Sequence, residues 1–245
     1  MQNIAVKTVR EIAVESPGTT RVFEEFKIDY CCHGNTLFDE ACRNAGASPD
    51  VVERKIDDLL RIDARGRLSL AALNLTELIE HIIDHHHVYT RQEMEHLTPL
   101  MTKVARKHGE HYPYLVGLKE VFQAVCDDLE PHMMREEMVL FPYIMQLDED
   151  LSSNTFASPP LFGTINNPVR IMRKEHDEVG ALLVKMRFLT NDYELPGDAC
   201  PSFTALYHRF EVLERDLHQH IHLENNVLFP RAVDLEQKIL PLASK

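Results

Sequence analysis

A chain of 245 residues, 44% hydrophobic and 27% charged, can bury a substantial core and has an ordinary globular composition. Its formal net charge of −13, without a cluster of Lys and Arg, excludes nucleic acid and anionic membranes as expected partners. No apolar run approaches the roughly 20 residues of a membrane span or has the form of a signal peptide, so we expect a cytoplasmic protein.

The beginning of the chain predicts a small helical domain. Thr8 and Glu11 have the spacing of a capping box, in which each side chain binds the backbone N–H of the other residue. Ser48 followed by Pro49 is typical of the start of another helix. We therefore expect one domain over residues 1–65 and a second over the remainder, 66–245.

In the second domain, apolar residues recur at steps of three and four along four long segments, as in amphipathic helices. Pro99 and Pro131 lie inside two of these segments and should kink the helix or move its boundary. The predicted fold class is all-α, with an antiparallel four-helix bundle after the small helical domain. The predicted helices cover about 75–107, 113–147, 167–190 and 202–238.

The bundle contains a repeated sequence. HMMREEMVLFP begins at His132 and HIHLENNVLFP begins 88 residues later at His220. Each copy places a glutamate four residues after its histidine, Glu136 in the first and Glu224 in the second. Residues four apart project from one face of a helix, with Cβ atoms about 5–6 Å apart. The two pairs can therefore bind one metal centre.

Both His/Glu pairs lie on the apolar stripes of their helices. Leu129 and Leu140 flank the first pair at helical steps, and Leu217 and Leu228 flank the second. Burying a carboxylate without a compensating partner costs several kcal/mol. We therefore expect a bound cation between these side chains.

Two further helices supply one histidine each. His176 lies on an apolar stripe 44 residues before His220, and the same step back from His132 falls beside His87, in a run of three histidines. The apolar residues before this run favour His86 as the inward-facing residue, whereas those after it favour His87. The repeat spacing selects His87 as the predicted ligand.

The predicted donor set is four imidazoles and two carboxylates. Structural zinc sites prefer four ligands rich in thiolate, and magnesium and calcium prefer oxygen donors. Six nitrogen and oxygen donors in the core of a four-helix bundle suit two carboxylate-bridged iron or manganese ions. A single core histidine is more often a packing residue, but two copies of one His/Glu pair favour a metal centre over a metal-free interaction bundle.

This order of a histidine, an HxxxE pair, a histidine and a second HxxxE pair resembles the hemerythrin-like domain of the iron-sulfur cluster repair di-iron proteins. The run DYCCHG at residues 29–34 is similar to the DYCC-G signature of the ScdA-type domain that precedes the bundle in that family. Together the two motifs extend the resemblance over nearly the whole chain.

The resemblance implies repair of iron-sulfur clusters damaged by nitrosative or oxidative stress. The implied cofactor is two iron ions bridged by an oxo group and carboxylates, with manganese the less favoured metal. The implied ligands are the terminal imidazoles of His87, His132, His176 and His220 and the bridging carboxylates of Glu136 and Glu224.

Cys31 and Cys32 are adjacent, and neighbouring Cα atoms lie about 3.8 Å apart, below the usual span of a disulfide. A bridge between them would be strained, so we expect reduced thiols. Their predicted role is redox relay, nitrosylation or transient contact with iron. The alternative is a pair of small buried residues in a helical turn.

The resemblance implies damaged iron-sulfur proteins as partners and nitric oxide or oxygen as a small ligand, and it leaves a homodimer open. Repair could proceed by iron delivery or by nitric oxide reduction, and the second route would make the protein an enzyme. The alternative function is a hemerythrin-like module that binds or senses oxygen or nitric oxide. The absence of an evident output domain and the cysteine pair favour repair.

Overall fold

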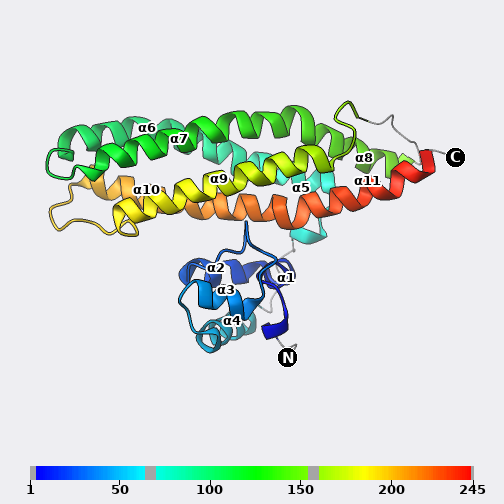
Figure 1. Cartoon of the computed structure of the whole chain (residues 1–245), viewed down its shortest axis with the longest axis horizontal. Coiled ribbons are helices and arrows are strands. Elements are labelled where there is room, and N and C mark those ends of the chain that lie inside the picture. Colours follow the sequence, from blue (N-terminus) through cyan, green and yellow to red (C-terminus); the bar gives the residue numbers. More distant parts are fainter. Residues whose placement is uncertain (1–3, 64–69, 154–159, 244–245) are drawn as a thin grey trace. The chain divides into compact units, whose positions relative to one another are not determined.

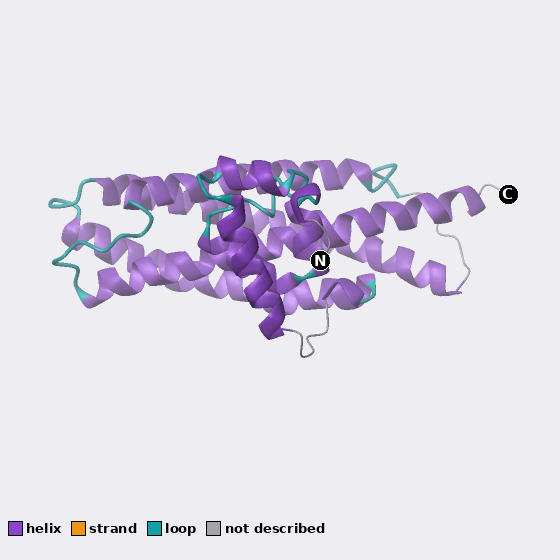
Figure 2. Cartoon of the chain, turned by 90° about the horizontal axis from the view of Figure 1, so that it is seen from below, coloured by secondary structure: helices purple, strands orange, loops and turns teal. Residues whose placement is uncertain are grey.

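The computed structural model describes residues 4–63, 70–153 and 160–243. No β-strand occurs in this part of the chain, which consists of helices and loops (Figure 2), and the predicted all-α class is confirmed. None of the described helices combines the length and apolarity needed to cross a membrane. The chain divides into two compact units: Met1–Ile79, Leu147–Ala157 and His218–Lys245 form the first, and Glu80–Gln146 and Ser158–Leu217 form the second.

The N-terminal part of the first unit contains α1 (Val9–Glu15), α2 (Thr20–Glu25), α3 (Phe38–Asn44) and α4 (Pro49–Asp63), with 3-10 turns at Ile4–Val6, Pro17–Thr19 and Leu70–Ala72. The predicted capping box begins α1, because Thr8 Oγ1 accepts the N–H of Glu11 and the Glu11 carboxylate accepts the N–H of Thr8. The helices pack around a core that includes Val9, Phe23, Phe38, Val52 and Ile56.

The loop between α2 and α3 contains the DYCCHG run and is closely packed at Gly34. A Cβ on Gly34 would lie 2.8 Å from Oδ1 of Asn226 and 2.9 Å from the carbonyl oxygen of Tyr30. Asn226 Nδ2 donates to that same carbonyl at 3.0 Å. This position therefore accepts glycine without rearrangement, whereas a larger residue must displace backbone.

We expect Gly34→Ala to lower the free energy of unfolding by about 1–3 kcal/mol, because overpacking against backbone forces a local shift. Gly197→Ala is the matched control, since a Cβ there has no atom within 4 Å. Urea denaturation of the two variants and the wild type measures the difference. Equal stability of all three proteins would contradict the close packing around Gly34.

The second unit is built on α6 (Val88–His108), α7 (Tyr114–Arg135), α9 (Asn166–Thr190) and most of α10 (Pro201–His222). Figure 1 shows these four long helices side by side, and the predicted four-helix bundle is confirmed. Their apolar stripes meet in one core, which includes Leu97, Leu118, Phe122, Val125, Leu183, Phe203, Phe210 and Leu217.

Three π-helical turns interrupt the long helices, at Ile83–His87, Glu136–Leu140 and Leu223–Leu228. The first joins α5 (Leu75–Ile82) to α6, the second joins α7 to α8 (Phe141–Ser153), and the third joins α10 to α11 (Phe229–Ala243). A π turn adds one residue to the helix and so rotates the following side chains by about 100°. Each of the three turns contains one predicted metal ligand.

The helical paths follow the predicted ranges closely. Pro99 lies inside α6 and Pro131 inside α7, and neither ends its helix. Of the two expected effects, the boundary shift does not occur, and the kink stays a prediction. The larger differences are at C-terminal ends, where α8 continues to Ser153 and α11 to Ala243.

Candidate metal centre

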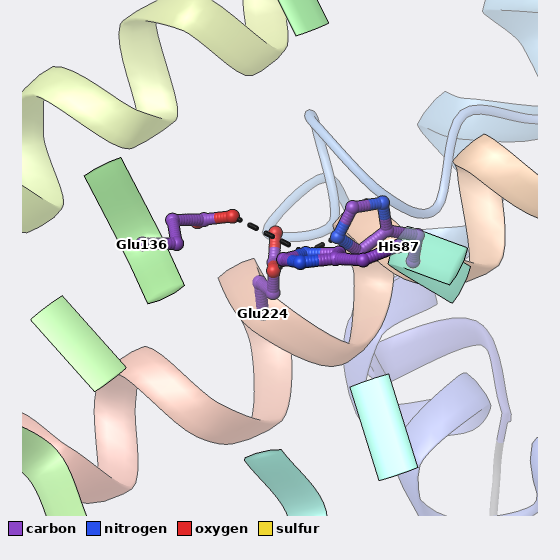
Figure 3. Close-up of side chains that lie close together, drawn as sticks. His87, Glu136 and Glu224 are labelled. Atoms are coloured by element: carbon purple, nitrogen blue, oxygen red, sulfur yellow. Dashed lines mark hydrogen bonds and ion pairs between the residues drawn. The ribbon is translucent and has the colours of Figure 1, made fainter. Parts of the chain in front are cut away.

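The π turns bring His87, Glu136 and Glu224 together. Figure 3 shows the three side chains pointing toward one another. His87 Nε2 lies 3.5 Å from Glu136 Oε2. All three residues are 0% exposed, so they form a polar cluster that is closed to bulk water.

Six residues form two overlapping groups of metal-binding donors. In each group, one donor atom from every residue lies within 4.8 Å of the others. Glu136 and Glu224 belong to both groups, whereas each histidine belongs to one. The arrangement is that of two metal positions sharing two carboxylates, and it contains all six predicted ligands. The groups are His87, Glu136, His220 and Glu224, and His132, Glu136, His176 and Glu224.

The distances between these donor atoms suit bound cations. His132 Nε2 lies 3.0 Å from His176 Nε2 and 3.3 Å from Glu136 Oε2. In the other group, His220 Nε2 lies 2.9 Å from Glu224 Oε1. Two donors at right angles on a six-coordinate ion, each about 2.1 Å from it, are about 3.0 Å apart. The residues present therefore fit a pair of metal ions.

The first π turn explains the conflicting signals in the histidine run. The apolar stripe before the turn includes Ile82 and the stripe after it includes Met94, and the extra residue shifts the helical phase between them. His86 and His87 are consequently both buried. His87 joins a metal group, whereas His86 Nδ1 lies 3.0 Å from Oδ1 of Asp216.

His87 is oriented by a glutamate and an arginine. Its Nδ1 donates to Glu137 Oε1 at 2.7 Å, and Arg91 Nη1 donates to the same oxygen at 2.7 Å. Partial burial raises the pKa of Glu137, but the hydrogen bonds from Arg91 and His87 outweigh it and the pKa is lowered. Because the Glu137 carboxylate accepts a hydrogen bond from the Nδ1–H of His87, the proton stays on Nδ1. The lone pair of Nε2 is then available to a metal ion.

His132 is held by the same kind of arrangement. Its Nδ1 donates to Glu175 Oε2 at 2.8 Å, and Arg135 Nη2 donates to Glu175 Oε1 at 2.6 Å. The hydrogen bond from His132 and the one from Arg135 lower the pKa of Glu175 to about 2, against the effect of partial burial. The ionised Glu175 fixes the ring so that Nε2 faces the metal group.

Neither Glu137 nor Glu175 is predicted from the sequence. Each stands next to a predicted ligand, Glu137 after Glu136 and Glu175 before His176. Adjacent residues on a helix point about 100° apart, so an acidic neighbour of an inward ligand faces the adjoining helix. The acidic residues next to Glu136 and His176 are therefore the signal that could have found Glu137 and Glu175.

Cys31 and Cys32 lie outside the two four-residue donor groups. They form a third group with Asp29 in the first unit. Their Sγ atoms are 3.8 Å apart, and no disulfide joins them in this structure. The hydrogen bond with Cys32 and burial raise the pKa of the Cys31 thiol well above its usual range.

Cys200 has the features of a reactive thiol. It directly precedes α10, and the backbone N–H groups of Phe203 and Ser202 lower the pKa of its thiol. His108 Nε2 lies 3.2 Å from Cys200 Sγ. A thiol at a helix N-terminus is stabilised as the thiolate, which is the nucleophilic form.

We expect a limiting amount of an alkylating reagent at neutral pH to modify Cys200 before Cys42 and Cys126. Burial raises the pKa of each of the latter two thiols to about 11, so little thiolate forms there. Mass spectrometry of the peptides over time measures the order. Modification of Cys126 as fast as Cys200 would contradict this assignment.

Two family models match the chain. Residues 78–232 match the model described as the hemerythrin HHE cation binding domain, and all six residues of the two donor groups lie in this range. Residues 5–60 match ScdA_N, described as a domain of unknown function (DUF542).

Curated proteins match along almost their whole length. The iron-sulfur cluster repair protein ScdA of Staphylococcus haemolyticus is 33% identical over 225 residues, covering 90% of this chain and 95% of that protein. A probable iron-sulfur cluster repair protein of Haemophilus influenzae is 32% identical, covering 95% and 99%. The iron-sulfur cluster repair protein YtfE of Dickeya chrysanthemi is 34% identical, covering 93% and 96%.

Proposed function

Because the chain belongs to the family of hemerythrin-like iron-sulfur cluster repair proteins, we propose that it repairs iron-sulfur clusters damaged by nitrosative or oxidative stress. The observation that carries the proposal is the pair of donor groups that share Glu136 and Glu224. A cytoplasmic location and a division into domains at 1–65 and 66–245 are parts of the same proposal. The matches at 5–60 and 78–232 support the division.

We propose a pair of iron ions, bridged by an oxo group and by Glu136 and Glu224, as the cofactor. His87 and His220 would hold one ion, and His132 and His176 the other. The bound pair would supply one-electron redox chemistry and exchangeable iron. The protein residues fix the donor atoms and exclude water, because each of the six is at most 2% exposed.

The shared carboxylates also favour iron delivery as the route of repair. Glu136 and Glu224 stabilise a ferric pair more strongly than a ferrous pair, because the ferrous pair carries less positive charge. They therefore hold iron less tightly after reduction, and the reduced protein is the proposed donor to a damaged cluster. Nitric oxide reduction at the same ions is the second route, and it requires a coordination position for the substrate.

The test combines the reduced, iron-loaded protein with an iron-sulfur enzyme inactivated by nitric oxide, under anaerobic conditions after excess nitric oxide has been removed. We expect enzyme activity to return, and to return less with an equal amount of free ferrous iron. If the protein consumes nitric oxide but does not restore the activity of the damaged enzyme, iron delivery is wrong and nitric oxide detoxification becomes the proposed function. Reversible oxygen binding with neither activity would favour the binding or sensing module.

A further inference from the structure

A second set of metal-binding side chains lies in the loop between α2 and α3. One donor atom each from Asp29, Cys31 and Cys32 lies within 4.8 Å of the other two. None of these residues belongs to the two donor groups that share Glu136 and Glu224. Cys31 is buried, Cys32 is partly exposed and Asp29 is exposed, so the group reaches from the core of the first unit to its surface.

The spacing of the three donors matches a tetrahedral ion. The two Sγ atoms are 3.8 Å apart, and Cys31 Sγ is 3.5 Å from Asp29 Oδ1. An ion with bonds of about 2.3 Å to sulfur and about 2.1 Å to oxygen places two sulfurs about 3.8 Å apart and sulfur and oxygen about 3.6 Å apart. Both observed edges agree with these values, whereas a disulfide would need about 2.05 Å between the sulfurs.

The loop backbone holds the group in place. Asp29 Oδ1 accepts the backbone N–H of Cys31 at 3.1 Å and that of Cys32 at 2.9 Å. His33 Nδ1 donates to Asp29 Oδ2 at 2.6 Å, the contact that commonly orients a metal-binding carboxylate. Asn226 Nδ2 donates to the carbonyl oxygen of Cys31 at 3.2 Å. The donors are therefore positioned by contacts that do not involve a metal.

The group is also open to exchange with solvent. The side chains of Asp29 and His33 are 43% and 74% exposed. Both line a surface depression of about 310 Å³, together with Lys27 and Thr36. Asp29 lines this depression and Cys32 is partly exposed, so an ion from solvent can reach two of the three donor residues.

We propose that Asp29, Cys31 and Cys32 bind a single thiophilic divalent cation of the class of Zn²⁺, Co²⁺ and Fe²⁺. Two sulfur donors exclude magnesium and calcium, and the carboxylate favours a divalent ion over Cu⁺. On binding, the two thiols release two protons to solvent and no electrons are transferred. The fourth position remains for water or a donor from another molecule. This site does not rest on the proposed repair function, because its donors are separate from the other centre.

The test is titration of the full-length, iron-loaded protein with Co²⁺ under reducing, anaerobic conditions. Thiolate bound to cobalt gives an intense charge-transfer band in the near ultraviolet, which nitrogen and oxygen ligands do not give. We expect the band to saturate at about one equivalent of cobalt. The Cys31→Ser/Cys32→Ser variant should lose it. No band in the wild type would overturn the proposal.

Two further variants separate ligation from folding. Cys200→Ser removes a thiol of the second unit and should leave the cobalt band unchanged. Loss of the band in Cys200→Ser would overturn the assignment. Asp29→Asn keeps an oxygen that accepts the loop N–H groups but removes the charge, so we expect cobalt affinity to fall at least tenfold. If the double variant does not fold, Cys32→Ser alone is the substitute, because Cys32 is partly exposed and its replacement should be tolerated. Loss of one of the two thiolates should halve the band. An unchanged band in Cys32→Ser contradicts the proposal.

Discussion

Replacing Glu136 or Glu224 by alanine should reduce the bound metal from about two ions per chain to well below one. Each carboxylate belongs to both donor groups, so one substitution removes a donor from both metal positions. His220→Ala should affect one position more than the other and retain about one ion, because His220 belongs to a single group. Elemental analysis of proteins purified from iron-replete medium measures the metal content.

Glu214→Ala is the matched control for this prediction. Glu214 is 1% exposed, as deeply buried as the proposed ligands, and its carboxylate pairs with Arg187 at 2.6 Å. Its removal leaves a partly buried guanidinium without this partner and should destabilise the protein, but the metal content should stay near that of the wild type. Equal metal loss in Glu214→Ala and Glu136→Ala would mean that stability, and not ligation, controls occupancy.

The helices and the donor residues could both be predicted from the helical spacing of apolar residues. Apolar residues at helical spacing mark the buried face, and a polar residue on that face, such as His132 or Glu224, requires a reason to be there. The repeat of the His/Glu pair indicated that the reason is a bound metal.

The π turns could not be predicted from local sequence. A π turn replaces good helical hydrogen bonds by poorer ones, and contacts with neighbouring helices decide whether it forms. Its only sign in the sequence is at the histidine run, where the apolar residues before the run favour His86 as the inward-facing residue and those after it favour His87. The group of Asp29 with the two cysteines was also not predicted, because it depends on a loop in which Asp29 accepts three successive backbone N–H groups.

Metal removal should lower the melting temperature by about 10 °C. A ligand present at about 1,000 times its dissociation constant stabilises the folded state by about 4 kcal/mol, and each kcal/mol corresponds to about 2–4 °C in a chain of this size. The metal-free protein also retains two fully buried carboxylates close together in the core. Thermal unfolding of the metal-loaded and chelated forms, followed by circular dichroism, measures the difference.

The variant Glu136→Gln should change the two forms in opposite directions. Without metal, a neutral amide of nearly the same shape removes one buried negative charge, which relieves repulsion from Glu224 and the loss of hydration, so the melting temperature should rise. With metal, the amide is a poorer bridging donor, so occupancy and the melting temperature should fall. A purely structural role predicts that Glu136→Gln lowers the melting temperature of both forms, because both would lose the same protein contacts. The sign of the change in the metal-free form therefore decides whether the buried glutamate is there for the fold or for the metal.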